Sequence, residues 1–153
     1  MITIQKSKTA DTRSCDFSQV TKEQLRESSI QHINDVRLGM NFIKEQINIS
    51  SALHDHDKLS GLDWFHADFI TGFKQTGWWD NHRKVNRHHL LQEDGVPSNV
   101  DLVDVIDMIV DCVMAGMGRT GTVYPLEINP EVLMTAFQNT VELLKSQVIV
   151  EGA

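Results

Sequence analysis

Several features that define other protein classes are scarce in this sequence of 153 residues. It has two cysteines, Cys15 and Cys112, which are too few for a disulfide framework and favour a reducing compartment. No apolar run approaches the roughly 20 residues of a membrane-spanning helix. Residues 1–8 also lack the apolar stretch of a signal peptide. We therefore expect a cytoplasmic protein without a membrane partner.

An excess of positive charge is also missing. The chain has 14 lysines and arginines against 21 aspartates and glutamates, a formal net charge of −7. Proteins that bind the phosphate backbone of nucleic acids usually present a basic face, so we expect no nucleic-acid partner. A small phosphorylated ligand remains compatible with this balance, because a bound metal ion would offset its charge locally.

Strand patterns are short, at residues 122–124 and 148–150, and the sequence has no internal repeat. Apolar residues recur instead at spacings of three and four, which predicts helices. We expect an N-terminal arm over residues 1–20 and one all-α domain over residues 21–153, a bundle of about five helices. The oligomeric state stays open, a homo-oligomer included.

Polar residues mark the ends of the expected helices. Thr21 and Gln24 form a capping-box pattern, which predicts a helix from residue 21 to about residue 47. Ser50–Ser51 is expected to interrupt that pattern and to cap a short helical turn. Asn129–Pro130 is typical of a helix start. The first helix is expected to bury an apolar stripe, made of Leu25, Ile33, Val36, Met40, Ile43 and Ile47.

Aromatic residues cluster between residues 62 and 79. Phe65, Phe69 and Phe73 recur at helical spacing and are expected to be core residues. Trp78 and Trp79 are adjacent, so they cannot both face inward from one side of a helix. We expect one in the core and one half-exposed, and a cleft wall is the alternative place for the second.

The densest polar stretch is His54-Asp55-His56-Asp57-Lys58. A run so rich in imidazole and carboxylate groups makes a poor core. An adjacent histidine and aspartate offer one nitrogen and one oxygen ligand at nearly the same place, which suits a divalent cation. All seven histidines lie between His32 and His89. The stretch is interpreted either as a metal site or as a solvated turn between two helices.

A second polar stretch, residues 80–89, contains His82, His88 and His89 together with three basic residues. Alone it would be read as a solvated basic patch. Its presence beside residues 54–58 in one small protein favours a shared metal site. Adjacent histidines on a helix point about 100° apart, so at most one of His88 and His89 is expected to be a ligand, and we favour His88.

Carboxylates interrupt the apolar helix expected over residues 100–117. Asp104, Asp107 and Asp111 must each be solvated, paired or metal-bound in such a helix. The small pair Ala115–Gly116 that follows would let another backbone segment approach closely. The sequence therefore predicts that one of these three aspartates contributes to the site.

In chain order, the ligand-capable residues are His32, His54–Asp55, His82, His88–His89 and Asp111. This order resembles the HD superfamily of metal-dependent phosphohydrolases, whose pattern is His, His-Asp and Asp on a helical bundle. Residues 54–60 and 86–89 look like a group of HD-like proteins common in phage and bacterial genomes. That group has His-Asp-x-Ser-Lys-Phe followed by Asn-x-His-His. The resemblance covers residues 30–120, and a phage-encoded chain would act in the host cytoplasm.

The match leaves two alternatives open. His56–Asp57 is a second His-Asp pair, but His54–Asp55 places Lys58 where the family has its lysine. Asp57 and Leu59 depart from the Ser and Phe of the family.

The last metal ligand is the second alternative. Asp104 and Asp107 are candidates, and we favour Asp111 because it is the last carboxylate and precedes Ala115–Gly116.

The resemblance implies a centre with one or two divalent ions, Mn, Fe, Co, Ni or Zn. His32, His54, Asp55 and Asp111 would hold the first. Asp55 would bridge to a second, which His82 and His88 or His89 would hold. Asp55 and His88 would be catalytic through the metals, and Lys58 and Arg87, or Arg119, would bind anionic oxygens of the substrate.

The expected function is hydrolysis of a nucleotide or another small phosphate ester, as a phosphatase or a phosphodiesterase. Two alternatives come from other classes of protein. One is a catalytically silent protein that binds a metal or sequesters a nucleotide, and the other is an HD-type di-iron oxygenase.

Overall fold

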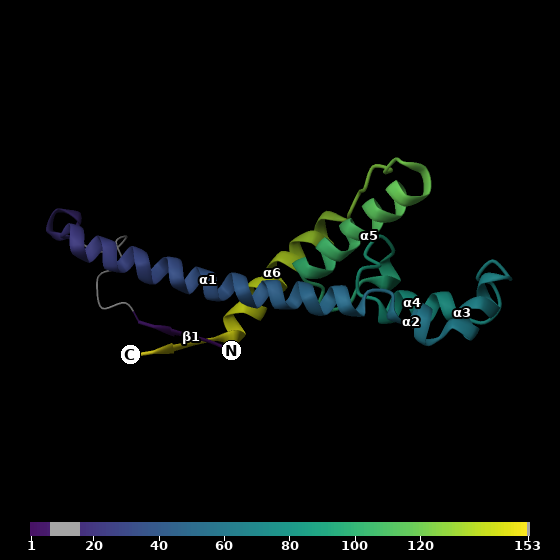
Figure 1. Cartoon of the computed structure of the whole chain (residues 1–153), viewed down its shortest axis with the longest axis horizontal. Helices are drawn as coiled ribbons and strands as arrows, with labels where there is room; N and C mark the ends of the chain where they lie inside the picture. The colour runs from purple at the N-terminus through teal and green to yellow at the C-terminus, as the bar shows by residue number, and fades with distance from the viewer. Residues whose placement is uncertain (7–15, 153) are drawn as a thin grey trace. The chain divides into compact units, whose positions relative to one another are not determined.

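The computed structural model describes residues 1–6 and 16–152, so Cys15 and part of the predicted N-terminal arm lie outside the described residues. The described chain is all-α apart from one pair of short strands, which confirms the expected fold class (Figure 1). The elements are β1 (Ile2–Gln5), α1 (Lys22–Leu53), α2 (His56–Ser60), α3 (Leu62–Phe69), α4 (Trp78–Val85), α5 (Leu102–Thr120), α6 (Pro130–Gln147) and β2 (Val148–Glu151), with short 3-10 turns at Phe17–Gln19 and Glu93–Gly95. Within the described ranges, no helix is both long and apolar enough to cross a membrane.

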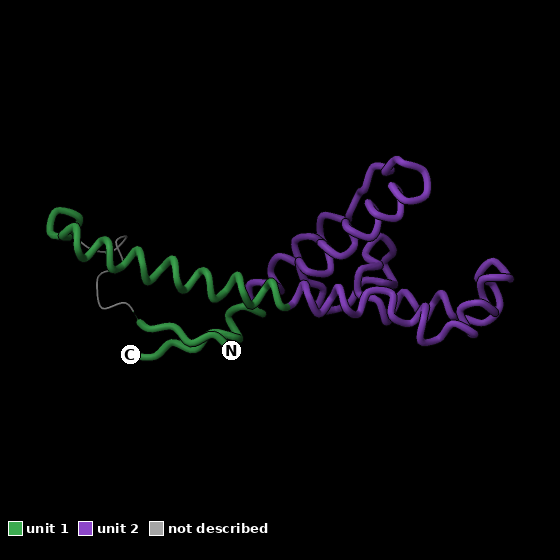
Figure 2. The backbone as a smooth tube through the Cα atoms, in the orientation of Figure 1, with its two compact units in different colours: residues 1–45, 143–153 green, residues 46–142 purple. Residues whose placement is uncertain are grey.

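The chain divides into two units (Figure 2). Residues 1–45 and 143–153 form the first unit, and residues 46–142 form the second. This division does not follow the expected boundary at residue 20. In the first unit, β1 pairs in parallel with β2, with Ile2 opposite Val148. A strand therefore occupies residues 2–5 of the predicted arm.

Helix α1 begins where the capping box predicts. The backbone N–H of Thr21 donates to the Gln24 side chain at 2.9 Å, and the N–H of Gln24 donates back to Thr21 Oγ1 at 3.1 Å. The helix continues to Leu53, six residues beyond the expected end. Ser50 does not interrupt it, because its hydroxyl donates to Asp107 at 2.7 Å instead of capping a new turn.

Burial along the long helices differs from the expectation. Most of the predicted α1 stripe is exposed, and only Ile43 is half-buried (Leu25, Ile33, Val36, Met40 and Ile47 are exposed). Phe137 of α6 is likewise 55% exposed. Helical spacing therefore predicted the helices correctly, but it did not predict which of their faces are buried.

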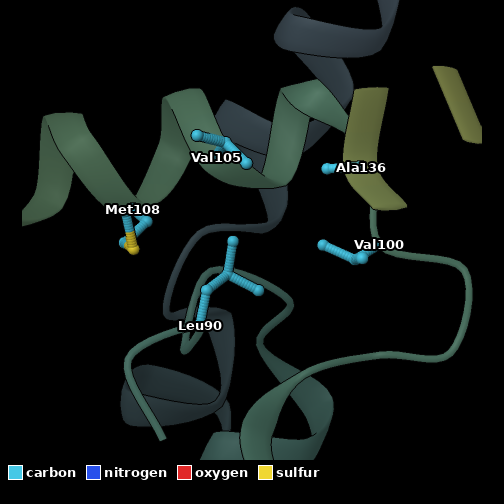
Figure 3. Packing of buried hydrophobic residues seen from close by; sticks show 5 residues of the cluster. All are labelled: Leu90, Val100, Val105, Met108 and Ala136. Atoms are coloured by element: carbon cyan, nitrogen blue, oxygen red, sulfur yellow. The ribbon is translucent and has the colours of Figure 1, made fainter. Parts of the chain in front are cut away.

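The core of the second unit joins α5 and α6 to the segment that follows α4 (Figure 3). Its buried members are Leu90, Val100, Val105, Met108 and Ala136. In Figure 3, Leu90 points from its loop towards Met108 and Val105 of α5. Burying such a side chain stabilises the fold by about 1.5–3 kcal/mol. Because Leu90 directly follows His89, this packing also fixes the position of the histidine pair.

The segment after α5 folds back tightly onto the helix at Gly116. A Cβ atom added to Gly116 would lie 2.7 Å from the backbone oxygen of Thr122. Gly121 reverses the chain between them, with a φ of 72°. The close backbone approach expected at Ala115–Gly116 is thus present, and the approaching segment is the chain's own residues 121–126.

Gly116→Ala should destabilise the protein, because the Thr122 carbonyl is backbone and has to shift. We expect a loss of about 1–3 kcal/mol, the usual cost of overpacking, measured by urea denaturation. Gly118→Ala is the matched control in the same helix, since a Cβ there meets nothing within 4 Å. It should instead stabilise by about 0.5–1 kcal/mol through helix propensity. Equal effects of the two substitutions would contradict this account of Gly116.

Candidate metal centre

Asp55 lies in the two-residue turn between α1 and α2. Its φ of 51° is left-handed, which is uncommon for a residue other than glycine. Its backbone N–H donates to the side chain of Asn86 at 3.1 Å, which ties the turn to the end of α4. Strained backbone of this kind clusters at functional sites. The turn therefore holds His54 and Asp55 next to the end of α4.

Two groups of ligand atoms meet at Asp55. His54, Asp55 and His88 form one group, and Asp55, His82 and His89 form the other. Within each group the atoms lie within 4.8 Å of one another. Asp55 is shared by both groups, and its role as a bridging metal ligand stays a prediction. Because all these residues belong to the second unit, the grouping is a feature of that unit alone.

The separations around Asp55 are longer than those of most hydrogen bonds and close to those between two ligands of one ion. His82 Nε2 lies 3.3 Å from Asp55 Oδ1, and His88 Nε2 lies 3.6 Å from the same oxygen. His54 Nε2 lies 3.6 Å from Asp55 Oδ2. Two ligands of one ion at bond lengths near 2.1 Å are about 3.0–3.4 Å apart. Small movements of these side chains would therefore suffice to coordinate a metal.

Several buried polar atoms at this place have no hydrogen-bond partner in the described structure. They are Asp55 Oδ1 and the Nε2 atoms of His82, His88 and His89. Leaving a buried polar atom unpaired typically costs about 1–3 kcal/mol. Four such atoms gathered at one point would be costly in the absence of a cation. Their arrangement fits a divalent ion in the space between them.

His82 is held with its metal-ligand nitrogen facing Asp55. Its Nδ1 lies 2.9 Å from Asp57 Oδ2, and a carboxylate can only accept, so Nδ1 must donate. In neutral His82, the Nε2 lone pair then points at Asp55. Asn86 supports the pair by donating to Asp57 at 2.8 Å. Asp57 thus orients a ligand, which is the usual second partner of a metal-bound histidine.

The pKa of Asp57 agrees with this role. Burial alone would raise the pKa of its carboxyl, but hydrogen bonds from Asn86 and His82 outweigh burial and hold it below the usual range. The carboxylate therefore remains ionised and continues to accept from His82. Of the two His-Asp pairs in the sequence, His54–Asp55 belongs to the ligand groups. Asp57 of the other pair accepts a hydrogen bond from His82 instead.

His54 is oriented in the same way by Asp107. Its Nδ1 lies 2.8 Å from Asp107 Oδ1, and Ser50 donates to the other oxygen. Asp111 Oδ1 lies 3.8 Å from His54 Nε2. Asp111 belongs to neither ligand group, so its role as the last metal ligand stays a prediction.

Asp104 has a structural role with Arg87. The guanidinium of Arg87 makes two hydrogen bonds of 2.7 Å to Asp104 and one of 2.9 Å to Asn99. Asp104 also accepts from the backbone N–H of Asp101 and so completes the capping box of α5. Arg87 holds the loop before α5 in place, and its donors point away from the ligand cluster.

His88 and His89 can both reach the site because they are not on a helix. Helix α4 ends at Val85, and Asn86 has extended backbone angles. His88 belongs to the first ligand group and His89 to the second. The expectation that only one of them faces the site assumed a helix, but α4 ends three residues before His88. Gly95 permits this path, since a Cβ there would lie 2.3 Å from the His89 oxygen.

Burial and crowding keep the histidine pair neutral. The pKa of His89 is lowered to about 4, chiefly by burial and then by the nearby His88 and His82. Burial also lowers the pKa of His88, and His54 adds to that effect. The rings are close, with centroids 4.4 Å apart for both His54–His88 and His88–His89. Neutral imidazole is the form that binds metals, so these ligands are ready at neutral pH.

Lys58 is the cation nearest to Asp55 within the described structure. Its ammonium is hydrogen-bonded to Asp55 Oδ2. Burial would raise the pKa of Asp55, but the hydrogen bond and charge of Lys58, with His54 and His82 nearby, outweigh burial, so the pKa is lowered. The carboxylate is therefore ionised and able to bind a metal ion.

A cavity of about 550 Å³ opens beside the ligand cluster. Asp55, His82, His88, His89 and Asp111 form one side of it. Lys58 and Arg119 also line it, and the remaining walls are largely aromatic. A small molecule in this cavity would touch the ligand cluster directly.

His32 lies on α1 within the first unit, where it is exposed. It belongs to neither ligand group, and its predicted role as a ligand stays a prediction. The sequence reasoning missed the orienting roles of Asp57, Asn86 and Asp107. The four-residue spacing of His82 and Asn86, which puts both on one helix face, was a signal that could have indicated Asn86.

The metal-free protein should lose stability as the pH falls from about 6.5 to about 4. In this window the unfolded chain gains a proton at His89 while the folded chain does not, so acid favours unfolding. Above pH 6.5 this contribution should be constant. Urea denaturation of chelator-treated protein from pH 7.5 to 4.5 measures it. His89→Gln should flatten the pH dependence, and an unchanged slope in that variant would contradict the assigned burial.

Comparisons with known proteins do not assign this chain to a family. Neither protein-family models, nor curated proteins, nor solved structures give a significant match. The geometry around Asp55 is therefore the observation from which its function is inferred.

Proposed function

We propose that this protein is a metal-dependent phosphohydrolase that acts on a small phosphate ester through a dinuclear centre at Asp55. The single observation that carries the proposal is the sharing of Asp55 by two groups of buried, unpartnered ligand atoms. A bridging carboxylate between two ions about 3.5–4 Å apart is typical of enzymes that hydrolyse phosphate esters.

The donor set fits catalytic rather than purely structural ions. Each group offers three protein ligands, which leaves coordination positions open for water or substrate. Mixed imidazole and carboxylate donors suit Mn, Fe, Co, Ni or Zn. When bound, such ions supply Lewis-acid polarisation of a phosphoryl oxygen and a nearby water of lowered pKa.

The chain's own residues would position the substrate. Lys58 and Arg119 line the cavity, so their side chains can bind anionic oxygens of a phosphoryl group. Lys58 would exchange its contact with Asp55 for one with the substrate once a metal neutralises the carboxylate. Arg87 is engaged by Asp104 and Asn99, so the proposal gives it a supporting role instead of the expected substrate contact.

The order of the ligands adds support from the resemblance. His54–Asp55, His82, His88–His89 and Asp111 follow the HD pattern, whose members act on phosphate esters, nucleotides among them. The alternatives expected from the sequence, a silent nucleotide binder and a di-iron oxygenase, would use the same ligands. A measurement of turnover is needed to distinguish these two functions from hydrolysis, because the structure is compatible with all three.

Metal content should depend on Asp55 more than on any other ligand. Protein loaded with Mn²⁺ or Zn²⁺ should contain two ions per chain by elemental analysis. Asp55→Ala should reduce the content towards zero, because both groups lose a ligand, and His89→Ala should reduce it towards one. Asp57→Ala should keep the ligands but weaken affinity by about 10–100-fold.

His56→Ala is the control for these variants. His56 is exposed and makes its hydrogen bond to the backbone of Leu53, so its loss should leave two ions bound. Full metal occupancy in Asp55→Ala would contradict the proposed centre and make Asp57 the candidate ligand.

Hydrolysis is tested by phosphate release from a panel of nucleotides and other phosphate esters with each candidate metal. We expect turnover that a chelator abolishes, that added metal restores, and that Asp55→Ala lowers by orders of magnitude. Iron-dependent oxygen consumption would favour the oxygenase alternative. Tight nucleotide binding without turnover would favour the silent binder, and either result would overturn the proposal.

A further inference from the structure

The cavity beside the metal centre has an unusual wall. Six aromatic side chains, which we call the aromatic wall, line it: Phe65, Phe69, Phe73, Trp78, Trp79 and Tyr124. They come from α3, from the turn after it, from α4 and from the segment that folds back at Gly116. The wall is therefore assembled from parts of the second unit that are far apart in sequence.

The aromatic wall adjoins the ligand cluster directly. The ring of Trp79 lies 5.4 Å from that of His82 and 5.5 Å from that of His89. Phe73 is in turn 5.4 Å from Trp79. A molecule that touches both the ligand cluster and the cavity would therefore lie beside these rings.

Hydrogen bonds hold the segment that carries part of the aromatic wall in place. Asp68 is fully buried, and its carboxylate accepts from the backbone N–H groups of Gln75, Thr76 and Trp79. These bonds fix the turn after α3 and the start of α4. Within that turn, Phe73 has a φ of 62°.

A left-handed conformation is strained for a bulky residue. In the described chain, the residues other than glycine with positive φ are Asp55 and Phe73. One is the shared carboxylate of the metal centre and the other belongs to the aromatic wall. Strain kept at both places points to a common functional role, since the surrounding structure must hold each residue in position.

Several rings of the aromatic wall are exposed to solvent and do not belong to the hydrophobic core. Tyr124 is 79% exposed, Phe69 is 59% exposed and Phe73 is 37% exposed. Exposed aromatic rings around a concave site beside polar groups are typical of surfaces that bind an apolar part of a ligand. Flat rings also favour flat partners, through stacked or edge-on contacts.

Positive charge in the cavity is limited. Among its lining residues, the cations are Lys58 and Arg119. Two side-chain cations beside two metal ions suit one phosphate group and leave none for a chain of phosphates.

We propose that the aromatic wall selects the substrate, which is a monophosphate ester whose alcohol part carries a flat aromatic group. This rests on the proposed function and specifies its substrate class. An aryl-substituted alkyl phosphate and a nucleoside monophosphate both belong to the class. Sugar phosphates and polyphosphates do not.

Binding is tested without turnover, by isothermal titration of the metal-loaded protein with two phosphonates. The probes are 2-phenylethylphosphonate and ethylphosphonate, which differ only in the phenyl ring. The aromatic probe should bind roughly 10–100-fold more tightly, as one stacked ring contributes in comparable sites. Equal affinity of the two probes, or no binding of either, overturns the inference.

Variants of the wall show whether these residues cause the preference. Phe73→Leu and Tyr124→Ala should each lower the affinity ratio of the two probes several-fold. Phe137→Leu is the matched control, because Phe137 is comparably exposed on α6 and does not line the cavity. If the affinity ratio is unchanged in both wall variants, the aromatic wall does not cause the preference for the aromatic probe. The same conclusion follows if Phe137→Leu lowers the ratio as much as the wall variants do.

Turnover separates this inference from the proposed function. Adenosine 5′-monophosphate and ribose 5-phosphate share a primary alcohol leaving group and differ in the base, so kcat/KM should favour the first by a similar factor. Hydrolysis of both at equal kcat/KM overturns the inference and leaves the proposed function intact. A phosphonate preference without hydrolysis of any ester supports the wall and overturns the proposed function.

Discussion

The second unit is organised around an electrostatic constraint at Asp55. Ring nitrogens of several histidines lie close to one ionised carboxylate. The nearest, His82 Nε2, is 3.3 Å from Asp55 Oδ1. Such an arrangement is unfavourable unless a proton or a metal ion lies between the atoms. Burial, together with the nearby His88 and His82, lowers the pKa of His89 to about 4, so this ring is neutral at neutral pH.

The rest of the unit keeps these side chains from turning away. Asp57 and Asp107 hold the far nitrogens of His82 and His54. Asn86 links Asp57 to the backbone of Asp55. Each of these hydrogen bonds pairs a polar group and also orients a side chain or backbone segment at Asp55. The hydrogen bonds that stabilise this network therefore also orient the side chains of the proposed metal centre.

The hydrophobic core also holds the loop that carries His88 and His89 in place. Leu90 packs against α5 immediately after the histidine pair, so the loop cannot move without opening the core. Arg87 fastens the same loop to Asp104 at the start of α5. These contacts connect the loop that carries two ligands to the helix that carries Asp107 and Asp111.

Much of the fold could be predicted from the sequence, because caps and helical spacing act locally. The capping box at Thr21 and the helix start at Asn129 are both present. The expected pair of tryptophans, one core and one half-exposed, is also confirmed, with Trp78 buried. The extent of α1 was wrong, because Ser50 bonds to Asp107, a partner 57 residues away. Local patterns cannot anticipate such a contact.

The sequence indicated Asp55 and the histidines that gather around it, but not the role of each side chain. The order of histidines and aspartates indicated Asp55 as a shared ligand, and that prediction agrees with the two ligand groups. The roles of Asp57 and Asp107 depend on which histidine nitrogen each one faces, which only the three-dimensional arrangement shows. The pairing of His88 with His89 depends on α4 ending at Val85, and a helix end is among the features that spacing alone places least well.

Anomalous X-ray diffraction from crystals of the manganese- or zinc-loaded protein tests the central claim most directly. Two anomalous peaks should appear about 3.5–4 Å apart, each about 2.0–2.2 Å from an oxygen of Asp55. One should lie beside His54 and His88, and the other beside His82 and His89. Peaks that avoid Asp55, or fully loaded crystals with no peak among these histidines, would contradict the account.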